Sequence, residues 1–307
     1  LNRAYKQVVK NKGAAGIDGM ECEALFSHLR TNGAQLKESI RNQAYNPLPV
    51  KRVEIPKEDG SKRKLGIPTV TDRLIQQAVA QVLTPIYERI FHRNSYGFRP
   101  EKSAQQAVLK AVEYMNDGYN WVVDIDLEKF FDTVDHNKLI SILNKEIKDG
   151  KVLSLIRKFL VSGVMVGEHM EETEIGTPQG GNLSPLLANI ILNELDWELE
   201  KRKLKFVRYA DDCIILVRSQ KAAQRVMDSI TKYIESKLLL KVNRKKSKIG
   251  RPIEIKYLGF TFYNQFNAKK YKAKAHEKSV QKVVRKLKQL TSCLLYTSDA
   301  ADDTPCV

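Results

Sequence analysis

The sequence predicts an α+β fold, and three observations indicate this class. Apolar residues recur at helical spacing over several long segments. They alternate or run together over short stretches bounded by turn residues, which is typical of strands. Short turns join two pairs of these strands, as in antiparallel hairpins. The 307 residues, of which 42% are hydrophobic and 29% charged, suffice for one large domain or two smaller ones around a real core.

The first part of the chain combines helices with one hairpin. Residues 20–44 predict a helix. Residues 48–68 predict the first hairpin, with the dipeptide Asp59-Gly60 at its tip. Helical periodicity then extends over 71–93 and 103–117, on either side of the segment NSYGFRP.

The second part of the chain starts with a buried strand, WVVDID, over residues 121–126. Asp135 can cap the helix that follows over DHNKLISILNKEI. The Gly/Pro loop IGTPQGG leads into a long helix with Ser184 and Pro185 at its favoured first positions. The remaining predicted elements are a hairpin around RYADDC (208–213), a helix over 219–237, short strands near 253–263 and a basic helix over 277–290.

The charge of the chain suits a phosphate-rich partner. Lys and Arg total 52 against 36 Asp and Glu, which gives a formal net charge of +16. No apolar run approaches the length of a membrane span. The four cysteines show neither CxxC pairing nor zinc spacing, so we expect a reduced, cytoplasmic compartment. The first residues contain neither an initiator Met nor a signal peptide, and we interpret them as the start of a fragment.

Two adjacent carboxylates, Asp211 and Asp212, stand at the tight joint of the second hairpin, between LKFV and IILV. Because like charges repel, we expect a positive partner there. Asp126 supplies a third carboxylate at the end of the strand 121–126. Carboxylates and phosphate oxygens are the ligands that Mg²⁺ prefers. The three side chains therefore predict a site for two Mg²⁺ ions, one activating a 3′-hydroxyl and the other neutralising a leaving pyrophosphate.

Neighbouring polar residues leave alternatives to this site. Asp124 shares a strand face with Asp126 by the period of two, so it is a second candidate for the metal ligand. Asp132 and Asp135 are expected to be capping or structural residues. His136, beside the cap, is expected to be structural rather than catalytic.

The motifs of this chain, in their order, resemble those of group II intron-encoded reverse transcriptases (maturases). The motifs are NKGAAGIDG, KRKLGIPTVTDRLIQQAV, SYGFRPEKSAQQAV, DLEKFFDTVDH, GTPQGGNLSPLLANI, RYADD, VNRKKSK and KYLGF. The resemblance covers about residues 1–290 and implies a right-hand polymerase. Its expected parts are fingers at 1–118, a palm at 119–265 and the start of a largely missing thumb at 266–290. We expect the aperiodic residues 291–307 to be a non-native or disordered tail.

The resemblance implies a role for each matching residue. Asp126, Asp211 and Asp212 match the catalytic, metal-binding aspartates, and Lys246 matches a lysine that assists pyrophosphate departure. The residues placed at the incoming nucleotide are Lys62 and Arg63 at the triphosphate, Phe131 at the sugar, Gln179 along the nucleotide and Tyr209 before the catalytic pair. The residues placed at the primer and template are Gly180, Gly181 and the primer-grip segment Tyr257, Leu258 and Gly259.

Some of these assignments have structural alternatives. Lys64 stands where the family more often has proline, so the register of Lys62 and Arg63 is open by one residue, and all three can belong to a solvated turn. Gly180 and Gly181 can serve the loop bend alone. Phe130, in place of Phe131, can face the site. The basic helix over 277–290 can be an ordinary surface helix instead of a thumb helix on a duplex.

The resemblance implies RNA-directed DNA synthesis from dNTPs with two Mg²⁺ ions, with Mn²⁺ as an alternative. The implied partners are an RNA template, a DNA or RNA primer and the intron's own RNA, bound for splicing and retrohoming in a bacterial cytoplasm. One other reading is a reverse transcriptase of a phage-defence, diversity-generating or CRISPR-associated system, although the form GTPQGGNLSPLLANI favours the intron lineage. The other is a non-enzymatic RNA-binding splicing cofactor, against which the intact aspartates argue.

Overall fold

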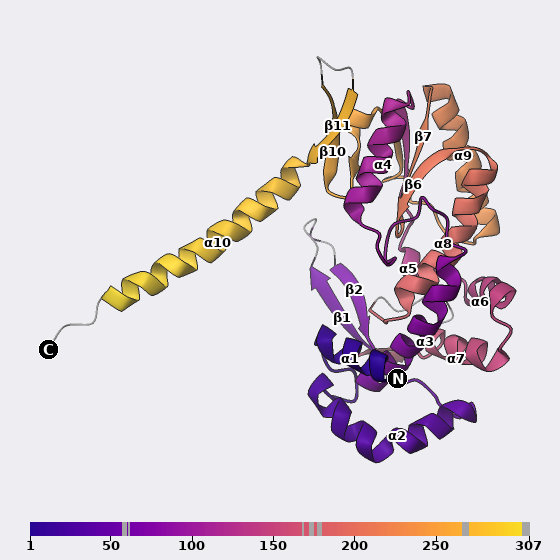
Figure 1. Ribbon diagram of the computed structural model, residues 1–307, viewed down its shortest axis with the longest axis vertical. Coiled ribbons are helices and arrows are strands. Elements are labelled where there is room, and N and C mark those ends of the chain that lie inside the picture. The colour runs from indigo at the N-terminus through magenta and orange to yellow at the C-terminus, as the bar shows by residue number, and fades with distance from the viewer. Residues whose placement is uncertain are drawn as a thin grey trace.

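The computed structural model describes residues 1–56, 60, 62–167, 169–171, 175–176, 180–265 and 270–302, with 292–302 as backbone alone (Figure 1). Its helices are α1 (Asn2–Asn11), η1 (Cys22–Ala24), α2 (Leu25–Arg41), α3 (Val70–Glu88), α4 (Ala104–Asn116), α5 (Phe130–Thr133), α6 (His136–Glu146), α7 (Gly150–Leu160), α8 (Ser184–Lys201), α9 (Gln220–Lys237), η2 (Pro252–Glu254) and α10 (Glu277–Asp302). Its strands are β1 (Val50–Pro56), β2 (Lys62–Ile67), β3 (Trp121–Ile125), β4 (Val164–Val166), β5 (His169–Glu171), β6 (Lys205–Tyr209), β7 (Asp212–Val217), β8 (Lys248–Gly250), β9 (Lys256–Tyr257), β10 (Phe260–Gln265) and β11 (Lys270–Ala275).

Both predicted hairpins and the predicted long helices are confirmed. Asp135 caps α6 through a 2.6 Å hydrogen bond from the Lys138 amide to its side chain. Helix α8 differs slightly from expectation, because Leu183 is its N-cap and Ser184 and Pro185 form its first turn. Of the predicted tip of the first hairpin, Asp59 lies outside the described residues and Gly60 has a φ of 79°. The elements α1, α5, α7, η2, β4, β5, β8 and β11 were not predicted.

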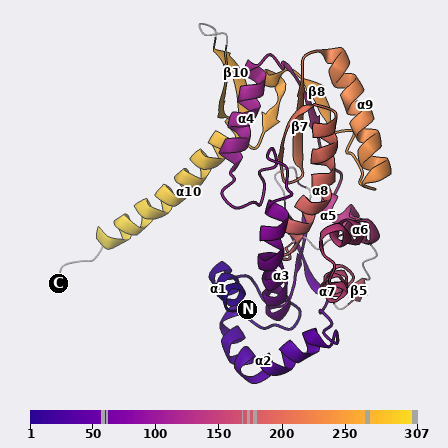
Figure 2. The ribbon, with the colours of Figure 1, turned by 45° about the vertical axis from the view of Figure 1, so that its right-hand side comes forward.

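The central sheet is antiparallel and has the strand order β6-β7-β3-β8. Because successive side chains point to opposite faces, each strand contributes to two cores. One face, with Val123, Ile125 and Ile215, packs in one cluster with α3, α6, α8 and α9. The other face, with Val122 and Ile214, packs against α4 and the three-stranded sheet β11-β10-β9. Figure 2 shows α9 and α4 on opposite sides of these strands.

The second sheet has the order β2-β1-β4-β5 and joins distant parts of the chain. Strand β1 pairs with β2 antiparallel and with β4 parallel, with Val50 opposite Val164. Contacts thus cross the expected boundary at residue 118 in both directions: β4 and β5 join the hairpin sheet, and α4 packs on the central sheet. The division into fingers and palm by residue number stays a prediction.

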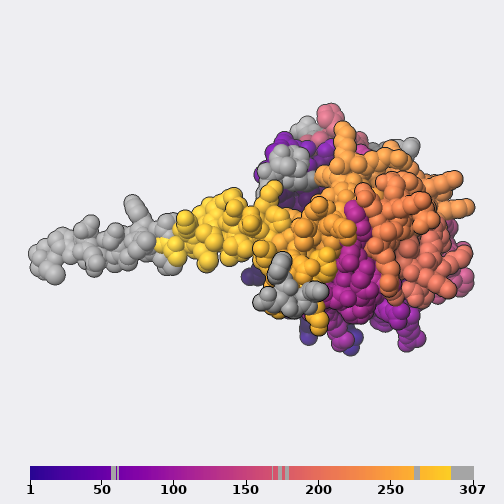
Figure 3. Space-filling model, turned by 90° about the horizontal axis from the view of Figure 1, so that it is seen from above, coloured from indigo at the N-terminus to yellow at the C-terminus, as the bar shows by residue number. Residues whose placement is uncertain are grey.

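The N-terminal helices pack around a core of their own, whereas the C-terminal helix is exposed. Helices α1, α2 and α3 share a small core that includes Ala4, Leu25 and Leu74. Helix α10 extends away from the body (Figure 3), and its apolar residues Val283 and Leu287 are 59% and 55% exposed. It continues past residue 290, where the predicted basic helix ends. Among the helices described, none combines the length and apolarity that a bilayer crossing requires.

Candidate active site

The second hairpin places two carboxylates at one tight turn. Strand β6 ends at Tyr209, strand β7 begins at Asp212, and these two residues pair with one another. Ala210 and Asp211 therefore form a two-residue turn, and Ala210 has a φ of 55°, the positive φ that such turns require. The hairpin predicted from RYADDC is thus present with its charged residues at the tip.

The third carboxylate reaches the same place through the central sheet. Strand β3 pairs antiparallel with β7, and Ile125 lies opposite Cys213. Asp126 follows Ile125 and Asp212 precedes Cys213, so the two aspartates lie side by side at this end of the sheet. The loop after α9 closes this end of β3, because the Asn243 amide donates to the Asp126 carbonyl at 2.9 Å.

These carboxylates line a cleft of about 990 Å³. The cleft is bounded by the ends of β3 and β7, the segment around α5, the hairpin β1–β2 and the loop 243–246. The predicted site residues among its lining are Asp126, Asp211, Asp212, Lys62, Arg63, Phe131 and Lys246. Further residues of the lining are Arg52, Lys64, Phe130, Asp132 and Asn243. The fold therefore brings residues from four separate sequence motifs around one space.

The carboxylates of the cleft affect one another's protonation. Burial, and then repulsion by Asp211, Asp124 and Asp126, raises the pKa of Asp212 to about 6. Burial also raises the pKa of Asp124 to about 6, although Lys248 opposes this shift. Asp124 is not among the residues that line the cleft, whereas Asp126 is. This placement favours Asp126 over the alternative Asp124 as the third member of the cluster.

The residues present fit divalent ions in their donor chemistry. In the part of the chain that the structure describes, no three His, Cys, Asp or Glu side chains are arranged closely enough to hold a metal ion by themselves. Three oxygen donors from Asp126, Asp211 and Asp212 nevertheless line one cleft and repel each other there. Mg²⁺ commonly takes one or two carboxylates and completes its shell with water and substrate phosphates, so an incomplete protein ligand set suits this ion.

The first hairpin turns a basic face toward the carboxylates. Cross-strand partners share a face, and Arg52 lies opposite Gly66 while Lys64 lies opposite Glu54. By the period of two, Lys62 belongs to the same face as Lys64 and Arg52. All three line the cleft, as does Arg63. The one-residue ambiguity in the register is therefore not decided, because Lys62, Arg63 and Lys64 all reach the space.

Arg52 was missed by sequence reasoning. Its Nε is buried and has no hydrogen-bond partner among the described residues. A buried guanidinium nitrogen without a partner is costly, so its position in the cleft fits an anionic group of a substrate. Lys62, by contrast, is exposed and lies 2.8 Å from Glu54 Oε2. The signal for Arg52 was the hairpin register, which places it on the same face as Lys62 and Lys64.

The two phenylalanines after β3 occupy different environments. Phe130 is 3% exposed and belongs to the main core. Phe131 is partly buried against that core, with its ring centroid 5.1 Å from that of Phe130 in an edge-on arrangement. Both side chains line the cleft, and Phe131 is the more accessible of the two.

The loop before α8 approaches the first hairpin. Gly180 has a φ of 122°, and a Cβ there would lie 2.5 Å from the Gly66 carbonyl oxygen. At Gly181 a Cβ would lie 2.7 Å from Gln76 Oε1. Gly180 is thus required by its φ and its contact with backbone, whereas at Gly181 a Cβ would meet side-chain atoms alone; the close packing of the loop agrees with the structural alternative. Gln179, the predicted nucleotide contact, lies outside the described residues.

Tyr209, Tyr257, Leu258 and Gly259 lie outside the lining of the cleft, as Gly180 and Gly181 do. Tyr209 is half-buried and packs against the core on the α4 side of the sheet. Tyr257 is 3% exposed, and its hydroxyl donates to the Val207 carbonyl at 3.3 Å. Tyr257 therefore supports the turn of Leu258 and Gly259 from the core. In that turn Leu258 and Gly259 have φ values of 50° and 81°.

His136 has a structural role. His136 is buried, and its Nε2 lies 2.6 Å from the Gly176 carbonyl oxygen, which fits its expected structural role.

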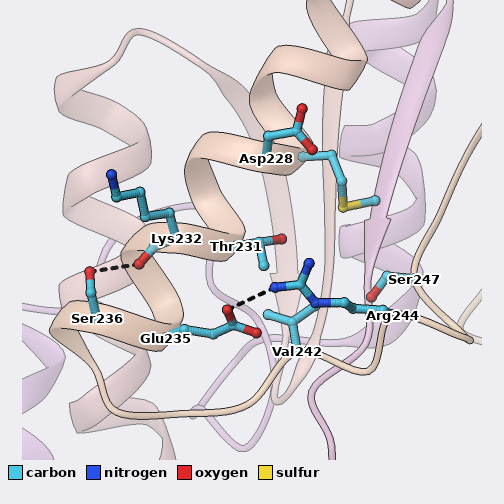
Figure 4. A pocket seen from close by; sticks show the side chains of 9 residues that line it. Asp228, Thr231, Lys232, Glu235, Ser236, Val242, Arg244 and Ser247 are labelled. Atoms are coloured by element: carbon cyan, nitrogen blue, oxygen red, sulfur yellow. Dashed lines mark hydrogen bonds and ion pairs between the residues drawn. The ribbon is translucent and has the colours of Figure 1, made fainter.

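A separate cavity of about 590 Å³ lies between α9 and the loop before β8 (Figure 4). There Arg244 forms an ion pair with Glu235 at 3.0 Å, so both charges are matched within the cavity wall.

Comparison with solved structures agrees with this fold. The telomerase of Candida albicans, in complex with an RNA fragment, superposes with a TM-score of 0.56 at 16% identity, over 70% of this chain and 44% of that chain. The apo telomerase of Candida tropicalis superposes with a TM-score of 0.57 at 13% identity, over 75% of this chain and 49% of that chain. At these identities the likeness concerns the fold alone.

Comparison with known sequences identifies the family. Protein YkfC of Escherichia coli is 33% identical over 290 residues, 81% of this chain and 76% of YkfC. The group II intron-encoded protein LtrA of Lactococcus lactis is 42% identical over 212 residues, 69% of this chain but 35% of LtrA. The nuclear intron maturase 2 of Arabidopsis thaliana is 31% identical over 205 residues, 52% of this chain and 28% of that protein. Residues 55–262 match the family model of the reverse transcriptase (RNA-dependent DNA polymerase), a family that uses divalent metal ions. The chain belongs to this family, among its group II intron-encoded reverse transcriptases and maturases.

Proposed function

We propose that this chain copies RNA into DNA by transferring nucleotides from dNTPs to a primer 3′-hydroxyl, at two Mg²⁺ ions held by Asp126, Asp211 and Asp212. The observation that supports this function is the cleft in which the three carboxylates face the basic side of the β1–β2 hairpin. When bound, the ions activate the attacking oxygen and stabilise the negative charge on the transferred phosphate.

The cations of the cleft match the charge of a nucleoside triphosphate. Arg52, Arg63 and Lys64 line the cleft from the hairpin, and Lys246 lines it from the loop 243–246. In the reaction, the primer 3′-oxygen gives its proton to water and bonds to the α-phosphorus, while the bond from that phosphorus to the pyrophosphate oxygen breaks and its electrons stay with the pyrophosphate. The hairpin cations bind the β- and γ-phosphates, and Lys246 stabilises the charge that develops on the departing pyrophosphate.

The remaining residues position the substrates. The ring of Phe131, which lines the cleft, lies under the sugar of the incoming nucleotide and excludes a 2′-hydroxyl. Leu258 and Gly259 are half-buried, and with the buried Tyr257 they form the segment that holds the primer end. Helix α10 presents basic side chains, which suits contact with the phosphate backbone of the primer–template duplex.

The intron role is carried over from relatives. LtrA is a group II intron-encoded protein and the Arabidopsis relative is an intron maturase by name. We propose accordingly that the protein binds the RNA of its own intron, to promote splicing and retrohoming. The chain spans only about a third of the length of LtrA, so splicing and retrohoming are proposals for this chain.

Primer extension tests the polymerase proposal. The 307-residue chain, in excess over a DNA primer annealed to RNA, should extend the primer with dNTPs and Mg²⁺. Asp211→Asn should abolish extension while leaving the affinity for the RNA–DNA duplex unchanged or higher, because the substitution removes one negative charge. The matched control is Asp228→Asn, an exposed aspartate on α9 beside the second cavity (Figure 4), which should extend normally.

Two results would contradict the proposal. Extension by Asp211→Asn at the wild-type rate would show that the carboxylates of the cleft are not the catalytic ones. Tight RNA binding by the wild-type chain without any extension, at any concentration of Mg²⁺ or Mn²⁺, would favour the non-enzymatic splicing cofactor.

A further inference from the structure

Arg208, two residues before the turn of Ala210 and Asp211, is completely buried. Its side chain is 0% exposed, in a position where a charge is retained only with matched partners. The guanidinium forms an ion pair with Asp196 of α8, which is also 0% exposed. Its Nε donates to Asp196 Oδ1 at 2.7 Å, and its Nη2 donates to Asp196 Oδ2.

The other guanidinium donors bind three different parts of the chain. Nη1 donates to Asn189 Oδ1 of α8 at 2.9 Å and to the carbonyl oxygen of Ala210 at 2.8 Å. Nη2 also donates to Ser95 Oγ at 2.7 Å. All five N–H groups of an arginine are thereby used. One of them holds the backbone of the turn itself, directly before Asp211.

The backbone of Arg208 is bound to the loop 94–97, which contains Ser95. Its amide donates to the Asn94 carbonyl at 2.9 Å, and its carbonyl accepts from the Tyr96 amide at 2.8 Å. The loop 94–97 thus adds a short parallel pairing to the edge of β6. Strand β6 is consequently held on the side away from β7, just before the carboxylates.

A close backbone contact completes the support. A Cβ at Gly97 would lie 2.2 Å from the Ala210 amide nitrogen, so glycine alone allows this approach. Asn189 Nδ2 donates to the Gly97 carbonyl at 2.7 Å and links this contact to the arginine. The backbone of Ala210, with its φ of 55°, therefore contacts both the Gly97 backbone and the Arg208 guanidinium.

We propose that Arg208 is a positioning residue that holds the turn of Ala210 and Asp211 at the distance from Asp126 that metal-dependent catalysis requires. The inference rests on the proposed function of the cleft. The buried guanidinium, Asp196, Asn189, Ser95 and Gly97 form one support, which we call the turn clamp. Through Ala210 it restricts where the carboxylates of Asp211 and Asp212 can lie.

Arginine is the residue that this arrangement needs. Lysine can retain one ion pair with Asp196, but a single ammonium cannot donate in the plane to Asp196, Asn189, Ser95 and Ala210 together. A buried ion pair is also weak evidence for stability, since an apolar pair of similar volume is often as stable. The retention of a buried Arg–Asp pair next to the carboxylates is better explained by the geometry that it imposes.

The chain contains a matched control that binds the same loop 94–97. Arg99 is also buried, at 6% exposure of its side chain, and it binds Glu88 and the carbonyls of His92 and Ser95. It therefore stabilises loop 94–97 with a comparable number of hydrogen bonds. Within the described residues, Arg99 makes no hydrogen bond to the turn of Ala210 and Asp211.

The experiment compares Arg208→Lys with Arg99→Lys in the complete chain. We expect both variants to lose thermal stability. Arg208→Lys alone should lower kcat for primer extension by about 10- to 100-fold, because small displacements of catalytic groups have effects of this size. Its KM for dNTP should stay within about threefold of wild type, and its half-saturating Mg²⁺ concentration should rise. Ser95→Ala, which removes one hydroxyl group and the hydrogen bond that it accepts, should also lower kcat with little change in KM, but only by a few-fold.

Amide hydrogen exchange supplies a readout that does not depend on activity. Arg208→Lys should accelerate exchange at residues 209–213 beyond the acceleration in Arg99→Lys. Equal kcat per folded molecule in Arg208→Lys and wild type, or equal exchange at the turn in the two lysine variants, would overturn the proposal. If the wild-type chain does not extend a primer, the proposed function fails, and hydrogen exchange still decides whether the clamp holds the turn.

Discussion

The Ser247 hydroxyl accepts a hydrogen bond from the Asp126 amide at 3.0 Å and lies 3.4 Å from the Asp126 carbonyl oxygen. The Asn243 amide donates to that same carbonyl at 2.9 Å. The loop 243–247 therefore holds the backbone at the end of β3, where Asp126 enters the cleft. The loop that presents Lys246 and the strand that presents Asp126 are consequently one structural unit.

Ser247→Ala tests the importance of this contact. The substitution removes the hydrogen bond between the Asp126 amide and the Ser247 hydroxyl, so we expect a loss of about 1 kcal/mol in unfolding free energy. We also expect the extension rate to fall by about three- to tenfold, because Asp126 is less well positioned. Ser236→Ala is the control, since the Ser236 hydroxyl bonds the Lys232 carbonyl at 2.6 Å within α9. Unchanged primer extension by Ser247→Ala would show that the end of β3 is positioned by the sheet alone.

Phe131→Ala should admit ribonucleotides. If the ring excludes the 2′-hydroxyl by collision, its removal should change the ratio of dNTP to rNTP incorporation by about 10²- to 10³-fold, since each 1.36 kcal/mol corresponds to a factor of ten. Phe130 is the internal control because it is 3% exposed and part of the core. Phe130→Ala should cost about 3–5 kcal/mol of stability and leave the ratio unchanged. The opposite pattern in the two variants would assign the sugar contact to Phe130.

Binding of an RNA–DNA duplex should weaken steeply with salt. The net charge of +16 predicts that phosphate contacts dominate the affinity. The exposed lysines of β11, Lys270, Lys272 and Lys274, share one face by the period of two, opposite the face that packs against α4. Their joint replacement by Gln should reduce the slope of log affinity against log salt by about two to three.

The control for this measurement keeps the same change in net charge. Lys221, Lys232 and Lys237 are exposed on α9, away from the β9–β11 sheet. Their joint replacement by Gln should leave the salt slope close to that of the wild type. Equal slopes in the two triple variants would mean that the β11 lysines face solvent instead of a duplex.

Asp72 predicts a pH dependence of stability. It is 1% exposed and accepts hydrogen bonds from Thr69 Oγ1 at 2.6 Å and Tyr45 Oη at 2.6 Å. Burial raises its pKa, although these hydrogen bonds oppose the shift. Because the folded state holds the proton more tightly, the contribution of Asp72 to stability is complete below the unfolded pKa and is lost as pH rises through the folded pKa. Asp72→Asn should therefore destabilise most at low pH.

The measurement is the unfolding free energy from urea denaturation between pH 4 and pH 8. The difference between the wild type and Asp72→Asn should shrink steadily as pH rises. Asp228→Asn, at an exposed position on α9, should give a difference that is small and independent of pH. A difference that grows with pH would mean that Asp72 is stabilised as the carboxylate in the folded protein.

Most elements were predictable from local patterns. Ser103 and Ser219, for example, accept hydrogen bonds from backbone amides at the starts of α4 and α9, as their positions in the sequence indicate. Strands β4 and β8 were missed because each has three residues, too few for an alternating pattern to be recognised. The α+β class and the polymerase fold agree with the comparisons, since telomerase structures superpose on most of the chain.

The residues of the candidate site were also predicted in part and missed in part. Asp126, Asp211, Asp212, Lys62, Arg63, Phe131 and Lys246 were predicted, and the fold brings them around one cleft. Arg52 was missed, because only the cross-strand register of the hairpin shows that it shares a face with Lys62. Tyr257 was predicted as a primer contact, but its burial places the ring in the core.

By itself the sequence determined the order of the longer helices, both hairpins and the meeting of Asp211 and Asp212 at a tight turn. Hairpins and helix caps depend on residues close together in the chain, so their signals are local. Only the tertiary structure decided that β3 lies beside β7, that β4 joins β1, and that Arg208 binds Ser95, 113 positions away. These contacts depend on which apolar faces are buried together and on which buried donors find acceptors, and local patterns do not specify either.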